Sequence, residues 1–264
     1  MQRSLLFLLL GLATAPLAQT TAALQTHDGP AVAIGDGEAW AFVRTHADGT
    51  PEAIGLMLTE TALDGLPAKA AMPGHEAMHM HTLALPAEAA DLGLGIDHIS
   101  LDWNPEGHEP EGLFTVPHFD MHFYMVPEAE RRTWLPSNPE FVAKAERFPE
   151  ARYLPASYVS PPDNLAIPLM GWHWFDGDDP TYAPGGPPFT EVFIWGSYDG
   201  QVIFPEPMMT RAWLQSKPDH VETLAQPEAV ARTGYYPTRY SVRYDPDARR
   251  YTIALDGFVH RTAS

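Results

Sequence analysis

The sequence predicts an α+β fold that is predominantly antiparallel β, barrel- or sandwich-like, with a few short helices. Proline accounts for 27 of the 264 residues, about double its usual share of ~5%. Because proline removes backbone donors and breaks helix interiors, a helical bundle is excluded. Short apolar runs with a period of two residues alternate with turn signals along most of the chain, as they do in antiparallel sheets.

Three strand pairs joined by tight turns are predicted, and the strongest hairpin signal is Asp199-Gly200. The paired runs are 38–46 with 52–60, 189–198 with 201–205, and 235–244 with 250–260. Further strands are predicted at 76–86, 96–103 and 113–126, and we expect 96–103 to be half-buried.

Helices are predicted to be few and short. Pro127 with acids after it marks the start of the first, and Ser137 or Asn138 caps the second. The predicted helices are 127–135, 137–147 and two weaker ones at 210–216 and 218–224. Residues 19–30 are expected to be a polar lead, and 153–188 a long Pro/Gly-rich connection.

The first 18 residues have the pattern of a secretory signal peptide. Arg3 precedes an apolar run of about a dozen residues, and small residues end at Ala18. The run is shorter than the roughly 20 residues of a membrane-spanning helix, so no membrane span is expected. We therefore predict a periplasmic or secreted protein in which 19–264 form a single β-rich domain. A division into two β units near 127–160 is the alternative.

Charge and cysteine content exclude several classes of function. Acidic residues outnumber basic ones by 34 to 16, which gives a formal net charge of −18. Such a chain repels phosphate backbones, so nucleic acid is excluded as a partner. The absence of cysteine excludes disulfides and thiolate chemistry. The expected partner is a small-molecule substrate or a metal, and a homo-oligomer is left open.

The segment 116–124 concentrates ligand chemistry on one face of a predicted strand. With a period of two, His118, Asp120 and His122 share one face, and Phe119, Met121 and Phe123 share the other. Imidazoles and a carboxylate at this spacing can converge on one divalent ion, or Asp120 can orient a ligating histidine. A polar face whose histidines only make hydrogen bonds is the alternative.

Three more candidate residues lie outside that strand. His108 is in a Gly/Pro-containing loop, His173 lies between Trp172 and Trp174, and Glu206 is held between two prolines. A buried imidazole needs a polar partner, and a metal is one candidate. The alternatives are an exposed loop histidine for His108, a hydrogen-bonded core histidine for His173 and a surface acid for Glu206.

A second histidine pair, His79 and His81, shares a strand face, with Met78 and Met80 on the other. The spacing suggests a cupin, but the glutamate expected shortly after His81 is absent. Histidine and methionine together also suit copper. His98 is on the polar face of 96–103 and is a reserve ligand only.

Several motifs together resemble a family of exported bacterial proteins of unknown function, one member of which is a thermophile protein under extracytoplasmic-stress sigma factor control. These motifs lie at 103–110, 116–124, 171–174 and 198–208, and the resemblance covers about residues 75–215. It implies a secreted β-rich domain and no particular reaction. The family pattern maps onto six positions here: His108, His118, Asp120, His122, His173 and Glu206.

The sequence therefore predicts one divalent transition metal, zinc first and iron or copper next. His118 and His122 are the favoured ligands, with His173 and either His108 or Glu206 completing the site. Asp120 or Glu206 is the expected general base. The residues expected to line the substrate pocket are Tyr124, Trp172 and Trp174.

The predicted activity is metal-dependent hydrolysis or a lyase reaction on a small molecule. A non-catalytic periplasmic metal- or ligand-binding or stress protein is the first alternative. A non-haem iron oxygenase is a weaker one, since His118, Asp120 and His173 follow the order of a two-histidine, one-carboxylate triad. A structural envelope protein without metal is the last.

Overall fold

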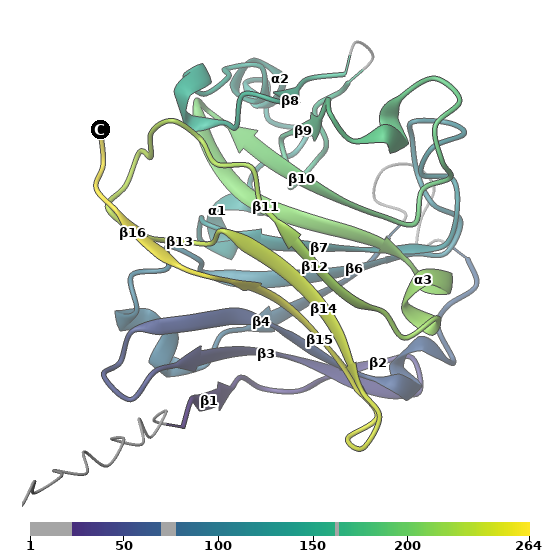
Figure 1. The fold of residues 1–264 in the computed structure, drawn as a ribbon. Coiled ribbons are helices and arrows are strands. Elements are labelled where there is room, and N and C mark those ends of the chain that lie inside the picture. Colours follow the sequence, from purple (N-terminus) through teal and green to yellow (C-terminus); the bar gives the residue numbers. More distant parts are fainter. Residues whose placement is uncertain (1–22, 70–77, 162–163) are drawn as a thin grey trace, which may run out of the picture.

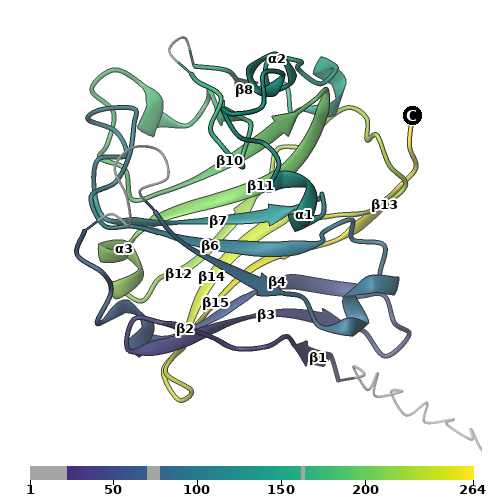
Figure 2. The same cartoon turned by 180° about the vertical axis from the view of Figure 1, so that it is seen from behind.

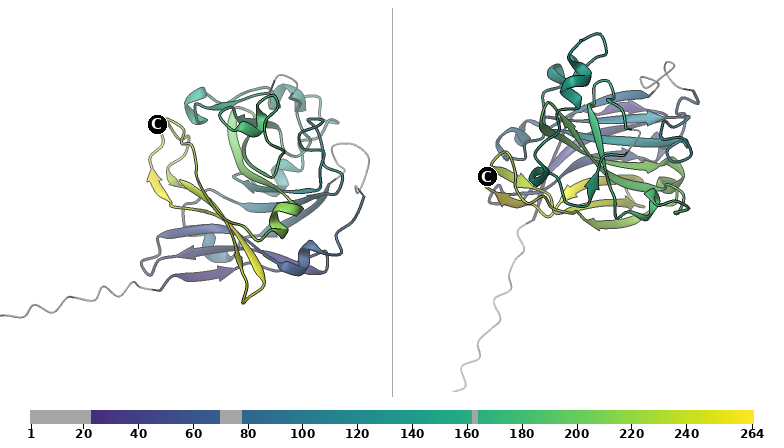
Figure 3. Two further views of the ribbon diagram at one scale, coloured as in Figure 1. Left: turned by 45° about the vertical axis from the view of Figure 1, so that its right-hand side comes forward. Right: turned by 90° about the horizontal axis from the view of Figure 1, so that it is seen from above.

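The computed structural model describes residues 23–69, 78–161 and 164–264. These residues form two large antiparallel sheets that face one another, with short helices and long loops at the outside (Figures 1 and 3). Both sheets are open, so the predicted mainly antiparallel α+β fold is confirmed in its sandwich-like form. The expected signal segment, 1–18, lies outside the described residues.

The first sheet combines strands from early and late parts of the chain, in the spatial order β1-β3-β4-β15-β14-β12 with β2 on β3. Its strands are β1 (Gln25–Asp28), β2 (Val32–Ile34), β3 (Gly37–Thr45), β4 (Pro51–Thr59), β12 (Asp219–Thr223), β14 (Arg239–Asp245) and β15 (Arg250–Asp256). A small separate sheet pairs β13 (Gly234–Tyr236) with β16 (Val259–Arg261).

The second sheet comes from the middle of the chain, in the order β5-β6-β7-β11-β10-β9-β8. Its strands are β5 (His79–Ala84), β6 (His98–Asn104), β7 (His118–Tyr124), β8 (Tyr158–Val159), β9 (Trp172–Asp176), β10 (Glu191–Tyr198) and β11 (Gln201–Thr210). The connection at 127–160 joins β7 to β8 within this one sheet.

The main apolar core lies between the two sheets because alternate residues of each strand point inward. Phe119 and Met121 of β7 pack in one buried cluster with Leu56 of β4 and Val242 of β14. The inward face of β7 is thus the apolar face that the sequence predicts. Its outward face carries the histidines and the aspartate.

The outward face of the second sheet is also covered, by the loops on either side of β7 and by the helical region. One apolar cluster packs Tyr124 and Phe204 with Trp134 and Phe141 of that region, and another packs Phe114 on Met208. Figure 2 shows α1 beside β7 on this side of the sheet. All seven residues of β6 are buried, so the expectation of a half-buried strand at 96–103 is wrong: the cover removes both faces from water.

The helices are shorter than predicted. They are α1 (Glu128–Arg131), α2 (Phe141–Ala145) and α3 (Arg211–Gln215), together with 3-10 turns at Glu60–Leu63, Ala87–Asp91, Ala151–Tyr153 and Pro180–Tyr182. The helix predicted at 218–224 is wrong, because β12 runs there and alternates exposed with half-buried residues along β14. The helices of the described part of the chain are too short and polar to span a membrane.

All three predicted strand pairs are present, as β3–β4, β10–β11 and β14–β15. The segment 19–30, expected to be a polar N-terminal extension, contains the strand β1, which pairs with β3. The connection at 153–188 contains β8 and β9, so His173 stands on a strand and not in a loop. The strand expected from 113 begins only at His118.

Candidate metal centre

The outward face of the second sheet gathers the predicted ligands and bases into two groups of three. In each group, one ligand atom from every residue lies within 4.8 Å of the others. The first triad is His108, His118 and Asp120, and the second triad is His122, His173 and Glu206. The residues that we expected around one ion, His118, His122, His173 and either His108 or Glu206, are therefore divided between two groups.

The first triad forms where the loop after β6 folds back onto β7. His118 Nε2 lies 3.1 Å from Asp120 Oδ1, and His108 Nε2 lies 3.4 Å from Asp120 Oδ2. Gly107 permits the fold-back: its φ is +72°, and a Cβ there would lie 2.1 Å from the carbonyl oxygen of Phe114. The next amide, of His108, donates to that same carbonyl.

Both histidines of the first triad have a defined tautomer. His108 Nδ1 donates to the Glu109 carbonyl and His118 Nδ1 to the Val116 carbonyl, each at 2.6 Å. A carbonyl can only accept, so Nδ1 carries a proton in both rings, and Nε2, which is directed at Asp120, is the nitrogen available to a metal ion. A backbone carbonyl behind the ring is the usual support of a metal-ligating histidine.

The contacts of Asp120 have the spacing of metal ligands. Its Oδ1 and His118 Nε2 are 3.1 Å apart, yet neither makes a hydrogen bond of acceptable geometry to any described residue. Two ligands on a tetrahedral zinc ion, with bonds of ~2.0–2.1 Å, are about 3.3 Å apart. Atoms at this separation that are not aimed at one another fit ligands of a common ion.

Charge interactions favour the ionised form of Asp120, which is the form that binds a cation. Burial acts to raise the pKa of Asp120, but His118 and His108 outweigh it and hold that pKa well below its ordinary value. Burial likewise acts to lower the pKa of His108, and the contact with Asp120 raises it overall. Asn104 Nδ2 donates to Asp120 Oδ2 at 2.7 Å and holds the carboxylate in place.

The second triad draws on three strands: His122 from β7, Glu206 from β11 and His173 from β9. His122 Nε2 lies 3.3 Å from Glu206 Oε1, and His173 Nε2 lies 3.6 Å from Glu206 Oε2. Burial, reinforced by the charges of Asp120 and Asp102, raises the pKa of Glu206 well above its ordinary value. Behind His122, Asp102 Oδ2 is 3.0 Å from Nδ1, and Ser100 donates to Asp102 Oδ1.

Of the residues expected to line a substrate pocket, Tyr124 lies beside the second triad, whereas the two tryptophans point away from His173. Tyr124 is fully buried and stacks on His122, with ring centroids 5.3 Å apart. Alternation puts Trp172 and Trp174 on the opposite face of β9 from His173, and they donate to the Ser160 and Ser197 hydroxyls.

Two surface pockets lie beside the helical region and beside β5. The first, of about 250 Å³, is lined by residues that include Trp134, Tyr198 and Arg232. The second, of about 430 Å³, is lined by residues that include Thr82 and His98. Triad residues do not line either of these two pockets.

Some residues that support the site went unrecognised in the sequence, namely Asn104, Asp102 and Ser100. The alternating face of 96–103 contained the signal, since its polar side chains point the same way as those of β7. His98 on that face is not a free ligand: Nδ1 bonds to Asp97 and Nε2 accepts from the buried Arg131.

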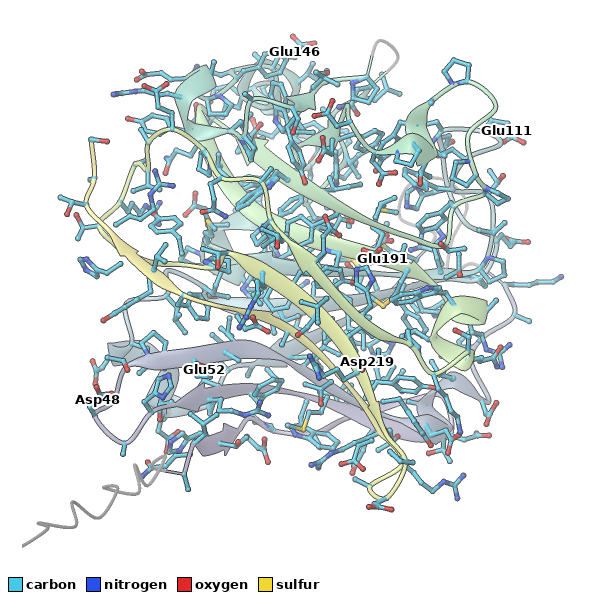
Figure 4. All side chains as sticks on the ribbon, viewed as in Figure 1. Asp48, Glu52, Glu111, Glu146, Glu191 and Asp219 are labelled. Atoms are coloured by element: carbon cyan, nitrogen blue, oxygen red, sulfur yellow. The ribbon has the colours of Figure 1, made fainter. Side chains whose placement is uncertain are left out.

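Other histidines and acids lie outside the triads. His79 and His81 are on the edge strand β5, where His79 Nε2 bonds to the Lys69 carbonyl. Glu111 is exposed on a peripheral loop (Figure 4). A third group, Glu191, His220 and Glu222, is partly buried.

Comparison with known proteins gives a short match to a family model. A family model described as TTHB210-like, hypothetical protein TTHB210, matches residues 47–103, from the turn before β4 to β6. No curated protein and no solved structure matches the chain. The resemblance was expected over about residues 75–215, and the match overlaps this stretch only at 75–103. The match ends before His108. Over residues 47–103, the chain is thus similar to a family of hypothetical proteins.

Proposed function

We propose that this protein is exported and binds a divalent transition metal, zinc first, at the first triad, where it promotes hydrolysis or a lyase reaction of a small molecule. The observation that carries the proposal is the convergence of two Nε2 atoms, each on a ring held through Nδ1, on the two oxygens of buried Asp120. The pattern of residues 1–18 supports export.

The donor set fits such an ion. Two imidazoles and one carboxylate hold zinc in several hydrolases and leave a position open, and the same set holds iron in non-haem oxygenases. A divalent ion bound this way acidifies a coordinated water to a pKa near ~7 and polarises a carbonyl or phosphoryl oxygen.

The protein supplies an enclosed site with one accessible side. The ring of His118 is fully buried, with the rings of Phe114 and Phe189 around it, whereas the side chain of His108 is 27% exposed. A small molecule would therefore approach past His108. Asn104 holds Asp120 from behind, so the carboxylate serves as a ligand in this proposal.

A non-catalytic metal-binding protein is the second candidate. It is favoured by the two surface pockets, which reach Trp134 and His98 but not the triad. In that case the ion would serve storage, delivery or stability.

The test uses mature protein purified without a histidine tag, in wild-type form and as His118→Ala, with His260→Ala as a control on an exposed histidine. Zinc content is measured by mass spectrometry, and turnover is measured with p-nitrophenyl phosphate, p-nitrophenyl acetate and a lactone. Turnover that is present in wild type and H260A and lost in H118A, together with a zinc content that falls in H118A alone, supports the proposal. Zinc binding without turnover favours the second candidate, and zinc content unaffected by H118A overturns both at this triad.

A further inference from the structure

We infer that the second triad holds its own divalent ion, so that the folded chain carries two ions on one face of the second sheet. This inference deepens the proposed function and rests on it for the choice of metal. The ligands are His122, His173 and Glu206, in a setting more enclosed than the first triad.

The second triad depends on a gap in the row of side chains on β10. His173 of β9 pairs with Gly196 of β10, which in turn pairs with Phe204 of β11. Since Gly196 has no side chain, the ring of Phe204 lies across this position, with centroids 4.7 Å from His122 and 5.4 Å from His173. The strand order therefore allows a histidine on β9 to reach Glu206 on β11, two strands away.

His122 is a buried histidine without conventional partners. Neither of its ring nitrogens makes a hydrogen bond of acceptable geometry within the described residues, and its side chain is 1% exposed. Asp102 Oδ2 lies 3.0 Å from Nδ1 on one side of the ring, and Nε2 on the other side is directed towards Glu206 and is the nitrogen available to an ion. A nitrogen placed this way at 3.3 Å from a carboxylate oxygen has the spacing of two ligands on one ion.

Glu206 contacts the two histidines with different oxygens. Oε1 lies beside His122 and Oε2 beside His173, and Oε2 has no hydrogen bond to any residue of the described ranges. The side chain of His173 is 12% exposed. One carboxylate between two imidazole nitrogens repeats the arrangement of the first triad.

The charge balance of the interior also calls for a second cation. Asp102, Asp120 and Glu206 are three carboxyl groups buried on this one face. An isolated buried carboxylate is costly unless it is paired or coordinates a metal. An ion at the first triad compensates Asp120, whereas Asp102 and Glu206 flank His122. The buried guanidinium of Arg131 is bonded to His98.

The two ions would differ in the rate at which they exchange with solution. The first triad has a partly exposed histidine, whereas the second joins three strands behind Phe204 and Tyr124. We expect the first ion to exchange with chelators quickly and the second slowly.

The inference is tested by counting zinc ions per chain in wild type and variants whose folding is checked by circular dichroism. The first-triad variants are His118→Ala and Asp120→Asn, and the second-triad variants are His173→Gln and Glu206→Gln. His220→Gln is the control for the partly buried third group and should keep both ions. Cobalt-loaded samples give an independent readout, because their visible absorption reports the ligand set of each ion.

The inference is supported if wild type binds two zinc ions, one that exchanges quickly and one that exchanges slowly, and if the variants of each triad lose one of them. A single ion that is lost in H118A but kept in H173Q and E206Q overturns it and leaves the proposed function standing. A single ion lost in H173Q and E206Q but kept in H118A supports an ion at the second triad and defeats the proposed function. If E206Q does not fold, the cobalt spectrum of H173Q decides.

Discussion

The ring of Phe204 lies against Gly196 on the neighbouring strand, and a Cβ added to Gly196 would be 2.0 Å from Phe204 Cζ. β10 and β11 pair these two residues directly. Because the same ring contacts His122 and His173, the missing side chain at Gly196 determines where both histidines of the second triad stand.

Gly196→Ala should therefore disturb both packing and metal binding. Overpacking of this kind costs roughly 1–3 kcal/mol, and displacement of Phe204 should abolish zinc binding at the second triad while the first keeps its ion. Denaturant unfolding and zinc counting measure the two effects. In a Phe204→Ala background the same substitution should cost much less; an equal cost in both backgrounds would contradict this account.

Asn104→Ala tests the support of the first triad. Asn104 donates to the buried Asp120 carboxylate, so its loss should lower the zinc affinity of the first triad about 10- to 100-fold. Zinc affinity is measured by competition with a chromogenic chelator. Asn138→Ala is the control, since the side chain of Asn138 accepts from the Glu140 amide near α2. Equal affinities in the two variants would rule out the positioning role of Asn104.

Arg131→Met should raise the pKa of His98. Burial lowers that pKa and the charge of Arg131 lowers it further, whereas Asp97 acts to raise it. Removal of the guanidinium leaves burial and Asp97 in place, so the titration should move upward. Proton NMR of the His98 ring is the measurement. Arg132→Met is the control, because Arg132 is exposed and pairs with Glu128; an unmoved His98 in R131M would refute the prediction.

Glu191 should make stability depend on pH. Burial, partly opposed by His220, raises its pKa to about 7 from an ordinary 4.5. A carboxyl group whose pKa is raised by folding stabilises the native state fully below pH 4.5, and this stabilisation is lost as the pH rises through about 7. Glu191→Gln stays neutral, so the free energy of unfolding of wild type relative to E191Q should fall by up to about 3 kcal/mol over this range.

The measurement for Glu191 is urea unfolding at pH 4.5, 6 and 7.5 in the presence of EDTA, so that metal binding does not contribute. Glu146→Gln, on an exposed side chain (Figure 4), is the control. A constant difference between wild type and E191Q across this pH range would contradict the assignment.

Metal removal should lower thermal stability. An ion at 100 times its dissociation constant stabilises the native state by about 2.7 kcal/mol, which for a chain of this size corresponds to roughly 5–10 °C in Tm per ion. Calorimetry with and without EDTA measures the shift. The double variant His118→Ala, Glu206→Gln should show no EDTA effect, and a shift of wild-type size there would place the metal elsewhere.

The ligand face of β7 could be predicted because it depends on local alternation alone. His118, Asp120 and His122 share the outward face as predicted, and the hairpin at Asp199-Gly200 has the expected turn. The grouping of the ligands could not be predicted, since it depends on strand order and on the loop turned back at Gly107. Strand pairing with β11 and β9 brings Glu206 and His173 to His122 and not to His118.

Two wrong predictions have a common physical origin in tertiary packing. The segment at 218–224 has few apolar residues and an initial proline, which permits a short helix, but pairing with β14 makes it a strand. The stretch 96–103 alternates like a half-buried strand, and the cover by the loops beside β7 and by the helical region buries its polar face. In both cases the deciding contacts come from other elements of the chain.

The first triad lies within residues 108–120, whereas the second spans residues 122–206. A short loop closes with a small entropy cost, so the first triad can assemble as soon as β7 and its preceding loop are formed. The second triad exists only once β9, β10 and β11 have joined β7 in the finished sheet. Under the proposed two-ion arrangement, a folding chain would thus acquire its ions in sequence, and a shortage of zinc would leave molecules that hold the first ion but lack the second.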